Sequence, residues 1–508
     1  MAFVSILWPD GHDVTQAVAA IPACFRDLNL DQIVAAVTAK WSEYDLVPFF
    51  CVPLTDPDAV AYRHEIMRDL ERESVARTIE RFAADMREVR QRAAQAEKGD
   101  YPHEKARWRL DAAVSYCNAV DTLRHELAAA EPASRGLIAF RDHLDRYVAS
   151  NAFRTLHDNT ADVNAQLDDI QYTVWLRGRS VTVQRYTGER DYGAVVEAVF
   201  ERFRRAAVRD YRARLMEDSE LNHVEAQILD HVALLFPDPF AALDRFASTY
   251  AQFVDPSVAR FDREIHFYVA YLAHIESYRR RGLTFCYPGV TKEKDIVIRD
   301  GFDLALAQQL AKGDAAIVLN DVHLQQNERI LVVSGPNQGG KTTYARMFAQ
   351  IHYLAALGCP VPAAKARLFL FDHVLTHFER EESSENLRGK LQDDLIRVRE
   401  LLDQATSNSI IILNEIFAST TLKDAALLAR QIVGRISDID CHAVCVTFLT
   451  ELATLSAKTV SAISIVDAAD PTRRTFRIER RPAEGVAYAM TLARKHRVTH
   501  DSIVQRIR

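Results

Sequence analysis

The sequence predicts a multidomain α + α/β protein, with a mostly helical region over residues 1–290 and an α/β domain over residues 291–508. Three observations predict this arrangement. The chain has 508 residues, which is enough for roughly two to four domains with buried cores. Helix-forming patterns dominate the first region. In the second region apolar segments of strand length alternate with helical patterns, which is typical of a sheet with helical connections.

Long amphipathic patterns fill most of the first region. Apolar residues recur at three-to-four spacing from Asp56 to Arg92, and residues 105–129 and 192–215 are similar. Helices of this kind bury their apolar stripes, so we expect long helices packed on one another. We expect their charge runs to be solvated faces with i,i+4 pairs.

One interruption predicts a β-hairpin near residues 172–185. Tyr172–Arg177 and Ser180–Arg185 are rich in β-branched and aromatic residues, and they flank Gly178. An arginine-dense segment follows, which could contact a phosphate backbone. The same segment contains acidic residues, so a solvated charged helix is the competing interpretation. The candidates for DNA contact are Arg202, Arg205, Arg209 and Arg212.

Six apolar segments carry the α/β prediction. They are Ala315–Leu319, Ile330–Ser334, Leu368–Asp372, Ser409–Leu413, Ala443–Phe448 and Ala462–Asp467. Each has the length of a buried strand, and helical patterns separate them.

Composition restricts the classes of partner. The net charge is −7, so a nucleic-acid surface would have to be a local patch. The chain has neither a signal pattern nor a long apolar run, so we expect a cytoplasmic location and no membrane partner. Its seven cysteines are dispersed, which argues against a disulfide framework. We expect Cys441 and Cys445 to be buried thiols rather than metal ligands.

The stretch Gly335-Pro-Asn-Gln-Gly-Gly-Lys-Thr342 fits Gly-x4-Gly-Lys-[Ser/Thr], the phosphate-binding P-loop. Glycines let successive N–H groups point at phosphate oxygens, Lys341 supplies a charge, and the Thr342 hydroxyl can hold Mg²⁺. An apolar strand precedes the loop and a helical pattern follows it, which places the loop at a helix N-terminus. The candidate ligands of the nucleotide from this motif are Gly335, Pro336, Gln338, Gly339, Gly340, Lys341, Thr342 and Thr343.

A second polar group follows an apolar strand, where Ser409–Leu413 leads into Asn414 and Glu415. In P-loop ATPases such a pair holds Mg²⁺ and activates water, so ATP and Mg²⁺ are the expected cofactors. Glu415 is the candidate general base, and Lys341 is the other candidate catalytic residue. Asn414 could hold Mg²⁺ through a bound water, but without negative charge. The competing interpretation is a strand that ends in two solvated polar residues.

Residues from about Phe285 to Ile507 resemble the ATPase domain of the MutS family, which belongs to the ABC ATPase class. The resemblance implies a homodimer through the ATPase domains, with composite sites that bind and hydrolyse ATP. It also places Asn320 and Asn337 near the nucleotide. The first region is weakly similar to the family's helical core and lever region. The segments that carry the resemblance are Leu319–His323, Gly335–Tyr344, Leu357–Ala363, Ala405–Ile416 and Gly485–Ala489.

Several positions depart from the family pattern. Asn414 replaces an aspartate, Phe448 stands at the position of a switch histidine, and Gly389 stands at the position of a serine that reaches the partner's nucleotide. These changes predict slow hydrolysis. The alternatives for the missing serine are Ser383, Ser384 and Asn386.

The departures resemble those of a shorter bacterial MutS-related subgroup. No Phe-x-Glu occurs in the chain, so we expect the mismatch-recognition module to be absent.

Two functions remain open from the sequence. The preferred one is a dimeric, ATP-gated DNA clamp, which acts on non-standard or branched DNA without reading mismatches, as in DNA repair. The alternative is a nucleotide-gated scaffold with weak ATPase activity that grips a protein or ribonucleoprotein.

Overall fold

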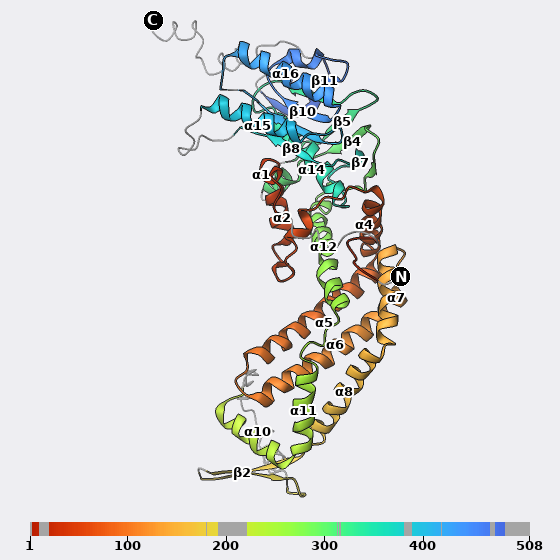
Figure 1. Ribbon diagram of the computed structural model, residues 1–508, viewed down its shortest axis with the longest axis vertical. Helices are drawn as coiled ribbons and strands as arrows, with labels where there is room; N and C mark the ends of the chain where they lie inside the picture. Colours follow the sequence, from red (N-terminus) through yellow and green to blue (C-terminus); the bar gives the residue numbers. More distant parts are fainter. Residues whose placement is uncertain are drawn as a thin grey trace, which may run out of the picture. The chain divides into compact units, whose positions relative to one another are not determined.

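The computed structural model describes residues 3–9, 20–178, 180–190, 221–311, 313, 316–379, 389–417, 419–467 and 473–482. The chain combines helices with sheets and divides into two compact units (Figure 1). Unit 1 comprises Met1–Phe3, Arg72–Pro132 and Ile138–Asp262. Unit 2 comprises Val4–Glu71, Ala133–Leu137 and Arg263–Arg508. The division of the chain at residue 290 stays a prediction.

Unit 1 contains the long helices that the sequence predicts. Helices α5 and α6 pack along their lengths, because both carry buried apolar residues at helical spacing. The rings of Phe140 and Phe261 stack with centroids 3.5 Å apart in the core of this unit. Helices α7 and α12 have residues in both units. The helices are α5 (Glu73–Lys98), α6 (Pro102–Ala130), α7 (Arg135–Val148), α8 (Asn151–Asp168), α10 (His223–Leu235), α11 (Pro237–Thr249) and α12 (Pro256–Arg279).

The single helical pattern from Asp56 to Arg92 is wrong in one respect, because it is divided between two helices. Helix α4 spans Pro57–Leu70 and α5 begins at Glu73. Between them Arg72 has extended backbone angles, φ −82° and ψ 125°, which end helical hydrogen bonding. Its guanidinium group donates to the carbonyl oxygens of Ala130 and Glu131, so a tertiary contact accompanies the break.

The predicted hairpin is confirmed. Strands β1 (Tyr172–Arg177) and β2 (Ser180–Arg185) pair antiparallel, from Tyr172 opposite Arg185 to Arg177 opposite Ser180. The expected helix at residues 192–215 lies outside the described residues. The candidate DNA contacts Arg202, Arg205, Arg209 and Arg212 lie outside them as well.

Unit 2 is built around a six-stranded sheet in the order β12-β11-β6-β10-β9-β8. Its strands are parallel except for β12, which is antiparallel to β11. Strands β6 and β10 are buried along their whole lengths, as continuous apolar runs predict. The strands are β6 (Ile330–Ser334), β8 (Val374–His377), β9 (Ile410–Asn414), β10 (His442–Val446), β11 (Thr459–Val466) and β12 (Arg474–Glu479).

Helices cover both faces of this sheet (Figure 1). Helices α15 (Lys390–Gln404) and α16 (Leu422–Ile439) share one apolar core with alternate residues of β6, β9 and β10. Helix α14 (Lys341–Ala356) packs against β9 and β10 from the other face. A smaller sheet in the order β3-β7-β4-β5 completes the strands: β3 (Gly289–Thr291), β4 (Ile296–Gly301), β5 (Asn320–Leu324) and β7 (Lys365–Phe369).

Three expected strands differ from the structure, and one of them, Ala462–Asp467, begins earlier, as β11 at Thr459. The expected strand at Ala315–Leu319 is wrong for its described residues 316–319, which precede β5 without forming a strand. Three of their side chains, from residues 316–318, line a cavity instead of joining a sheet. The expected strand Leu368–Asp372 begins earlier, as β7 at Lys365, because it pairs with β4 and β3.

The segment Val4–Glu71 belongs to unit 2. The Arg63 guanidinium group is fully buried, and it donates to the carbonyl oxygens of Leu7 at 3.0 Å and Leu357 at 2.9 Å. Gln350 likewise donates to the carbonyl oxygen of Leu28 at 2.9 Å. The short helices of this unit are α1 (Cys24–Asp27), α2 (Leu30–Thr38), α3 (Val47–Phe50), α4 and α13 (Leu304–Leu310).

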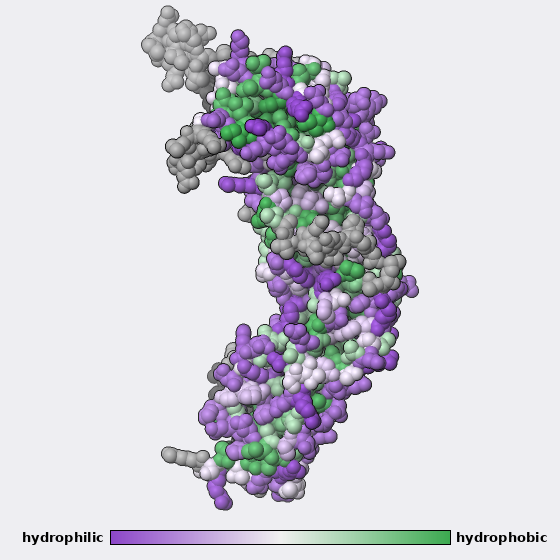
Figure 2. All heavy atoms as spheres, in the orientation of Figure 1, coloured by the Kyte–Doolittle hydropathy of each residue, from purple (hydrophilic) through white to green (hydrophobic). Residues whose placement is uncertain are grey.

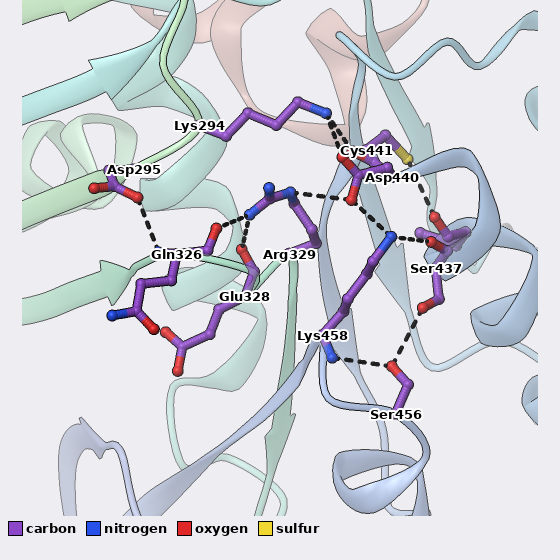
Figure 3. A network of polar contacts seen from close by, with 11 residues as sticks. Lys294, Asp295, Gln326, Glu328, Arg329, Ser437, Asp440, Cys441, Ser456 and Lys458 are labelled. Carbon is purple, nitrogen blue, oxygen red and sulfur yellow. Dashed lines mark hydrogen bonds and ion pairs between the residues drawn. The ribbon is translucent and has the colours of Figure 1, made fainter.

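A single carboxylate joins three segments at the amino-terminal edge of the large sheet (Figure 3). Asp440 ends α16 and accepts from Lys294 at 2.8 Å and from Lys458 at 2.7 Å, while Arg329 lies 3.3 Å away. Burial raises the pKa of Asp440, but hydrogen bonds from both lysines and the charge of Arg329 hold it well below its usual range. The network therefore ties the segments that precede β4, β6 and β11 to the end of α16.

Cys441 and Cys445 are both buried, as predicted, and no group of metal-ligating side chains is found among the described residues. Within that part of the chain, no helix has the length and apolar character needed to cross a bilayer.

Candidate functional site

The loop between β6 and α14 lies at the carboxyl edge of the parallel strands. Gly335 has φ 121° and Gly340 has φ 87°, and glycine adopts such angles with the least strain. Gly339 is required for a different reason, because a Cβ there would lie 2.3 Å from Ser464 Oγ. The glycines of the motif therefore serve both backbone conformation and close packing against β11.

Lys341 begins α14, and its side chain folds back over the loop. Its Nζ atom donates to the carbonyl oxygens of Gly335 at 2.9 Å and Pro336 at 3.2 Å, and to Asn337 Oδ1 at 3.3 Å. Burial lowers the pKa of Lys341, Glu415 opposes this change, and Arg474 adds to it. The ammonium group is thus held among oxygen acceptors at the centre of the loop.

The polar residues after β9 meet this loop. Thr342 Oγ1 donates to Asn414 Oδ1 at 2.9 Å, although 72 positions separate the two residues. Glu415 Oε1 lies 3.9 Å from Lys341 Nζ. Glu415 has φ 52°, and its N–H donates to the carbonyl oxygen of Val446 at 2.9 Å. Because β9 and β6 are both parallel to β10, their carboxyl ends bring these side chains together.

Two contacts of the loop were not predicted from the sequence. Ser464, on β11, is buried and donates its hydroxyl to the carbonyl oxygen of Gly339 at 2.8 Å. Arg474, on β12, donates from Nε to the carbonyl oxygen of Asn337 at 3.3 Å. Neither residue lies in a motif, and only the order of strands in the sheet places them beside the loop.

Asn320 joins β5 to β12. Its Oδ1 accepts from the Ile478 N–H at 2.7 Å, and its Nδ2 donates to the carbonyl oxygen of Phe476 at 3.2 Å. Phe476 has φ 58° and is half-exposed. Asn320 and Phe476 both line the same cavity as the loop, so β12 forms one wall of the site.

The cavity has a volume of about 510 Å³, which is within the usual range for a small-molecule site. The loop residues and Glu415 contribute polar groups to its lining. Apolar side chains also line it, and they are Phe302, Leu306, Ile317, Val318 and Met347. The structure therefore brings together all the site residues predicted in the loop from Asn337 to Thr343, together with Asn320 and Glu415.

Of the positions that depart from the family pattern, Asn414 contacts this cluster through Thr342, whereas Phe448 and Gly389 do not line the cavity. Phe448 follows β10, and its side chain is 50% exposed. Gly389 precedes α15 as its N-cap residue, without a side chain to contribute. The alternatives Ser383, Ser384 and Asn386 lie outside the described residues.

The sequence around this site is similar to that of known proteins. A family model described as MutS domain V matches residues 331–505, which contain the loop, β9 and β11. The C-terminal part of this chain belongs to the MutS family. The match starts within β6, so the six-stranded sheet and its loop are the part that defines the membership.

Curated MutS-family relatives match the same part of the chain. The DNA mismatch repair protein MutS of Halalkalibacterium halodurans is 32% identical over 151 residues, which are 30% of this chain and 17% of the relative. The protein of the same name from Chlorobium phaeobacteroides is 29% identical over 263 residues, or 51% of this chain and 28% of the relative. That of Orientia tsutsugamushi is 29% identical over 193 residues, or 38% and 21%. The matches thus span less than a third of these relatives.

Proposed function

We propose that this chain binds ATP with Mg²⁺ in the cavity beside the β6–α14 loop and hydrolyses the ATP slowly. The observation that carries the proposal is that Lys341, Thr342 and Glu415 line that cavity together, while Asn414 accepts a hydrogen bond from Thr342. The helix N-terminus and the loop N–H groups suit a phosphate chain. The apolar side chains of the lining suit a nucleobase.

Each residue has a distinct proposed role. Lys341 would exchange its loop acceptors for phosphate oxygens, which form stronger charge-assisted hydrogen bonds. The oxygens of Thr342 and Asn414 lie 2.9 Å apart and are of the type that Mg²⁺ prefers. The metal would neutralise charge on the phosphates. The Glu415 carboxylate would take a proton from the attacking water.

We further propose that the protein works as a homodimer through its ATPase domains, and that ATP gates its grip on non-standard or branched DNA. The family membership supports this, because the matched relatives are named as DNA mismatch repair proteins. The family has an aspartate at the position of Asn414, and the loss of that charge supports the slow turnover. Arg202, Arg205, Arg209 and Arg212 stay candidate DNA contacts.

The second candidate function is a nucleotide-gated scaffold with feeble turnover that grips a protein or ribonucleoprotein. Three observations favour it over a DNA motor. Asn414 brings no charge to the metal position, Gly389 brings no side chain toward a partner site, and Phe448 is an exposed aromatic residue. The net charge of −7 also disfavours unspecific DNA binding.

The deciding experiment measures ATP turnover and nucleotide affinity for the wild type and for Glu415→Gln, with and without linear or branched DNA at low salt. We expect Glu415→Gln to lower kcat by roughly 10²–10⁴-fold, because it removes a general base. The affinity for ATP should change little, since the glutamine keeps the shape of the side chain. Asp424→Asn, on the exposed first turn of α16, is the matched control.

The outcomes separate the two functions. DNA-stimulated turnover that is lost in Glu415→Gln, with DNA binding that weakens steeply as salt rises, supports the clamp. Tight ATP binding with negligible turnover and no DNA effect supports the scaffold. An affinity for ATP that is absent in the wild type would refute both.

A further inference from the structure

Within the part of the chain that the structure describes, the β1–β2 hairpin of unit 1 has one open edge. Helix α10 packs against β2, and Arg185 of β2 donates to the carbonyl oxygen of Leu235 at the end of that helix. Among the described helices and strands, β1 packs extensively only against β2. A hairpin of two strands is marginally stable in water on its own, so its open edge favours a further strand.

The strand at the open edge, β1, also contributes to an apolar face of the hairpin. Tyr172, Val174 and Leu176 share one face, because side chains alternate along a strand. Their exposed fractions are 45%, 38% and 78%, respectively. Val181 and Val183 lie opposite Leu176 and Val174 and extend the same face onto β2. Figure 2 shows hydrophobic atoms at the surface of unit 1 where the hairpin and α10 lie in Figure 1.

The same three residues direct their backbone groups outward. The Tyr186 N–H donates to the carbonyl oxygen of Gln171, which fixes the alternation of hydrogen-bonded pairs along the hairpin. Thr173, Trp175 and Arg177 therefore direct their N–H and C=O groups toward β2. Tyr172, Val174 and Leu176 direct theirs to the open edge, and the pairing of β1 with β2 contains no bulge.

We propose that β1 pairs antiparallel with β1 of a second copy of this chain, which joins the two hairpins into a four-stranded sheet. A two-fold axis at Val174 sets this residue opposite itself, and it sets Tyr172 opposite Leu176 of the second copy. The apolar faces of the two hairpins then form one continuous face. Each strand supplies the backbone donors and acceptors that the other lacks.

The charges around β1 favour a second copy as the occupant. Asp168 and Asp169 precede the strand, and Arg177 ends it. Antiparallel pairing brings the acidic end of one strand beside the basic end of the other, whereas parallel pairing would set like charges together. A nucleic acid would instead meet the two aspartates at one end of the edge. The contact is smaller than a standard interface, so we expect it to be weak.

Oxidation of a Val174→Cys variant of the full chain tests this register. Directly opposed residues of a hydrogen-bonded antiparallel pair have Cα atoms about 5.5 Å apart, which allows a disulfide. We expect a disulfide-linked dimer on a non-reducing gel. Val224→Cys, at an exposed position on α10, is the control and should remain at least tenfold less linked. Six of the seven native thiols are buried, so their background is small.

A second pair of variants tests the role of the edge. In the Val174→Cys background, Leu176→Lys should reduce the linked dimer at least tenfold, because lysine at an edge opposes strand pairing. Leu234→Lys should leave it unchanged, although Leu234 is 77% exposed and Leu176 is 78% exposed. A chain that stays monomeric, or one that Leu176→Lys does not affect, overturns the proposal.

The inference does not depend on the nucleotide site. Lys341→Ala in the Val174→Cys background should abolish ATP binding. It should leave the yield of disulfide-linked dimer unchanged at matched protein concentration. A dimer that forms without measurable ATP binding in the parent chain would therefore support the hairpin contact and refute the proposed function separately.

Discussion

Asn414 holds the hydroxyl group of Thr342 with a neutral oxygen at the proposed metal position. Replacement by aspartate keeps the shape and adds a negative charge beside that hydroxyl. We expect Asn414→Asp to raise the affinity for Mg²⁺ by about 1–2 kcal/mol, or roughly tenfold, because ionised acceptors bind more strongly. The measurement is the Mg²⁺ dependence of ATP binding. Asn408→Asp, in the turn before β9, is the control, and equal Mg²⁺ dependence in both variants would contradict the proposed role.

Gly339 illustrates how close packing restricts a single position. An added Cβ would lie 2.3 Å from Ser464 Oγ and 2.9 Å from the carbonyl oxygen of Pro336, so the loop would have to move. We expect Gly339→Ala to weaken ATP binding at least tenfold, about 1.4 kcal/mol, as measured by titration calorimetry. Gly434→Ala is the control, because no atom lies within 4 Å of its added Cβ and alanine favours a helix. Undiminished affinity in Gly339→Ala would show that the loop can shift freely.

The strands that carry these residues depend on contacts at their opposite ends. Asp440 closes α16 with φ 62° and collects Lys294, Arg329 and Lys458 around one carboxylate (Figure 3). Its side chain is 35% exposed, so solvent screens part of the interaction. The network fixes the starts of β6 and β11, whereas the site lies at their other ends.

We expect Asp440→Asn to lower the free energy of unfolding by about 1–2 kcal/mol at pH 7, after allowance for exposure. Asparagine also tolerates the left-handed backbone, so the loss reports the charge. The folded pKa of Asp440 is lowered, so its contribution is present above the unfolded pKa of about 4 and is lost as pH falls below it. Thermal unfolding of both proteins from pH 7 to pH 3 checks this. A difference in stability that stays constant over that range would contradict the electrostatic cause.

Elements with local signals were the ones that the sequence predicted well. The hairpin matches residue for residue, because its β-branched runs and Gly178 are contiguous. The loop from Gly335 to Thr342 was likewise predicted from one continuous motif. Ser464 and Arg474 were missed because their contacts depend on β11 and β12 lying beside β6 in the sheet, which no local pattern encodes.

The two units provide separate reporters of stability, since Trp8 and Trp41 lie in unit 2 and Trp108 and Trp175 lie in unit 1. We expect ATP with Mg²⁺ at about 100 times its Kd to stabilise unit 2 by about 2.7 kcal/mol. A variant with Trp108→Phe and Trp175→Phe should therefore show a higher unfolding temperature when ATP is added. The same variant with Lys341→Ala is the control. An unchanged unfolding temperature at saturating ATP would contradict nucleotide binding in unit 2.

The discontinuous sequence of unit 2 has a consequence for synthesis on the ribosome. Residues 4–71 emerge before the rest of unit 2. The contacts of Arg63 with Leu357 and of Leu28 with Gln350 can form only after nearly 300 further residues are translated. Unit 1, from Arg72 to Asp262 apart from five residues, emerges in the interval. Unit 1 can therefore fold co-translationally while residues 4–71 still expose apolar surface. Residues 4–71 are therefore the part of the nascent chain that we expect a chaperone to bind.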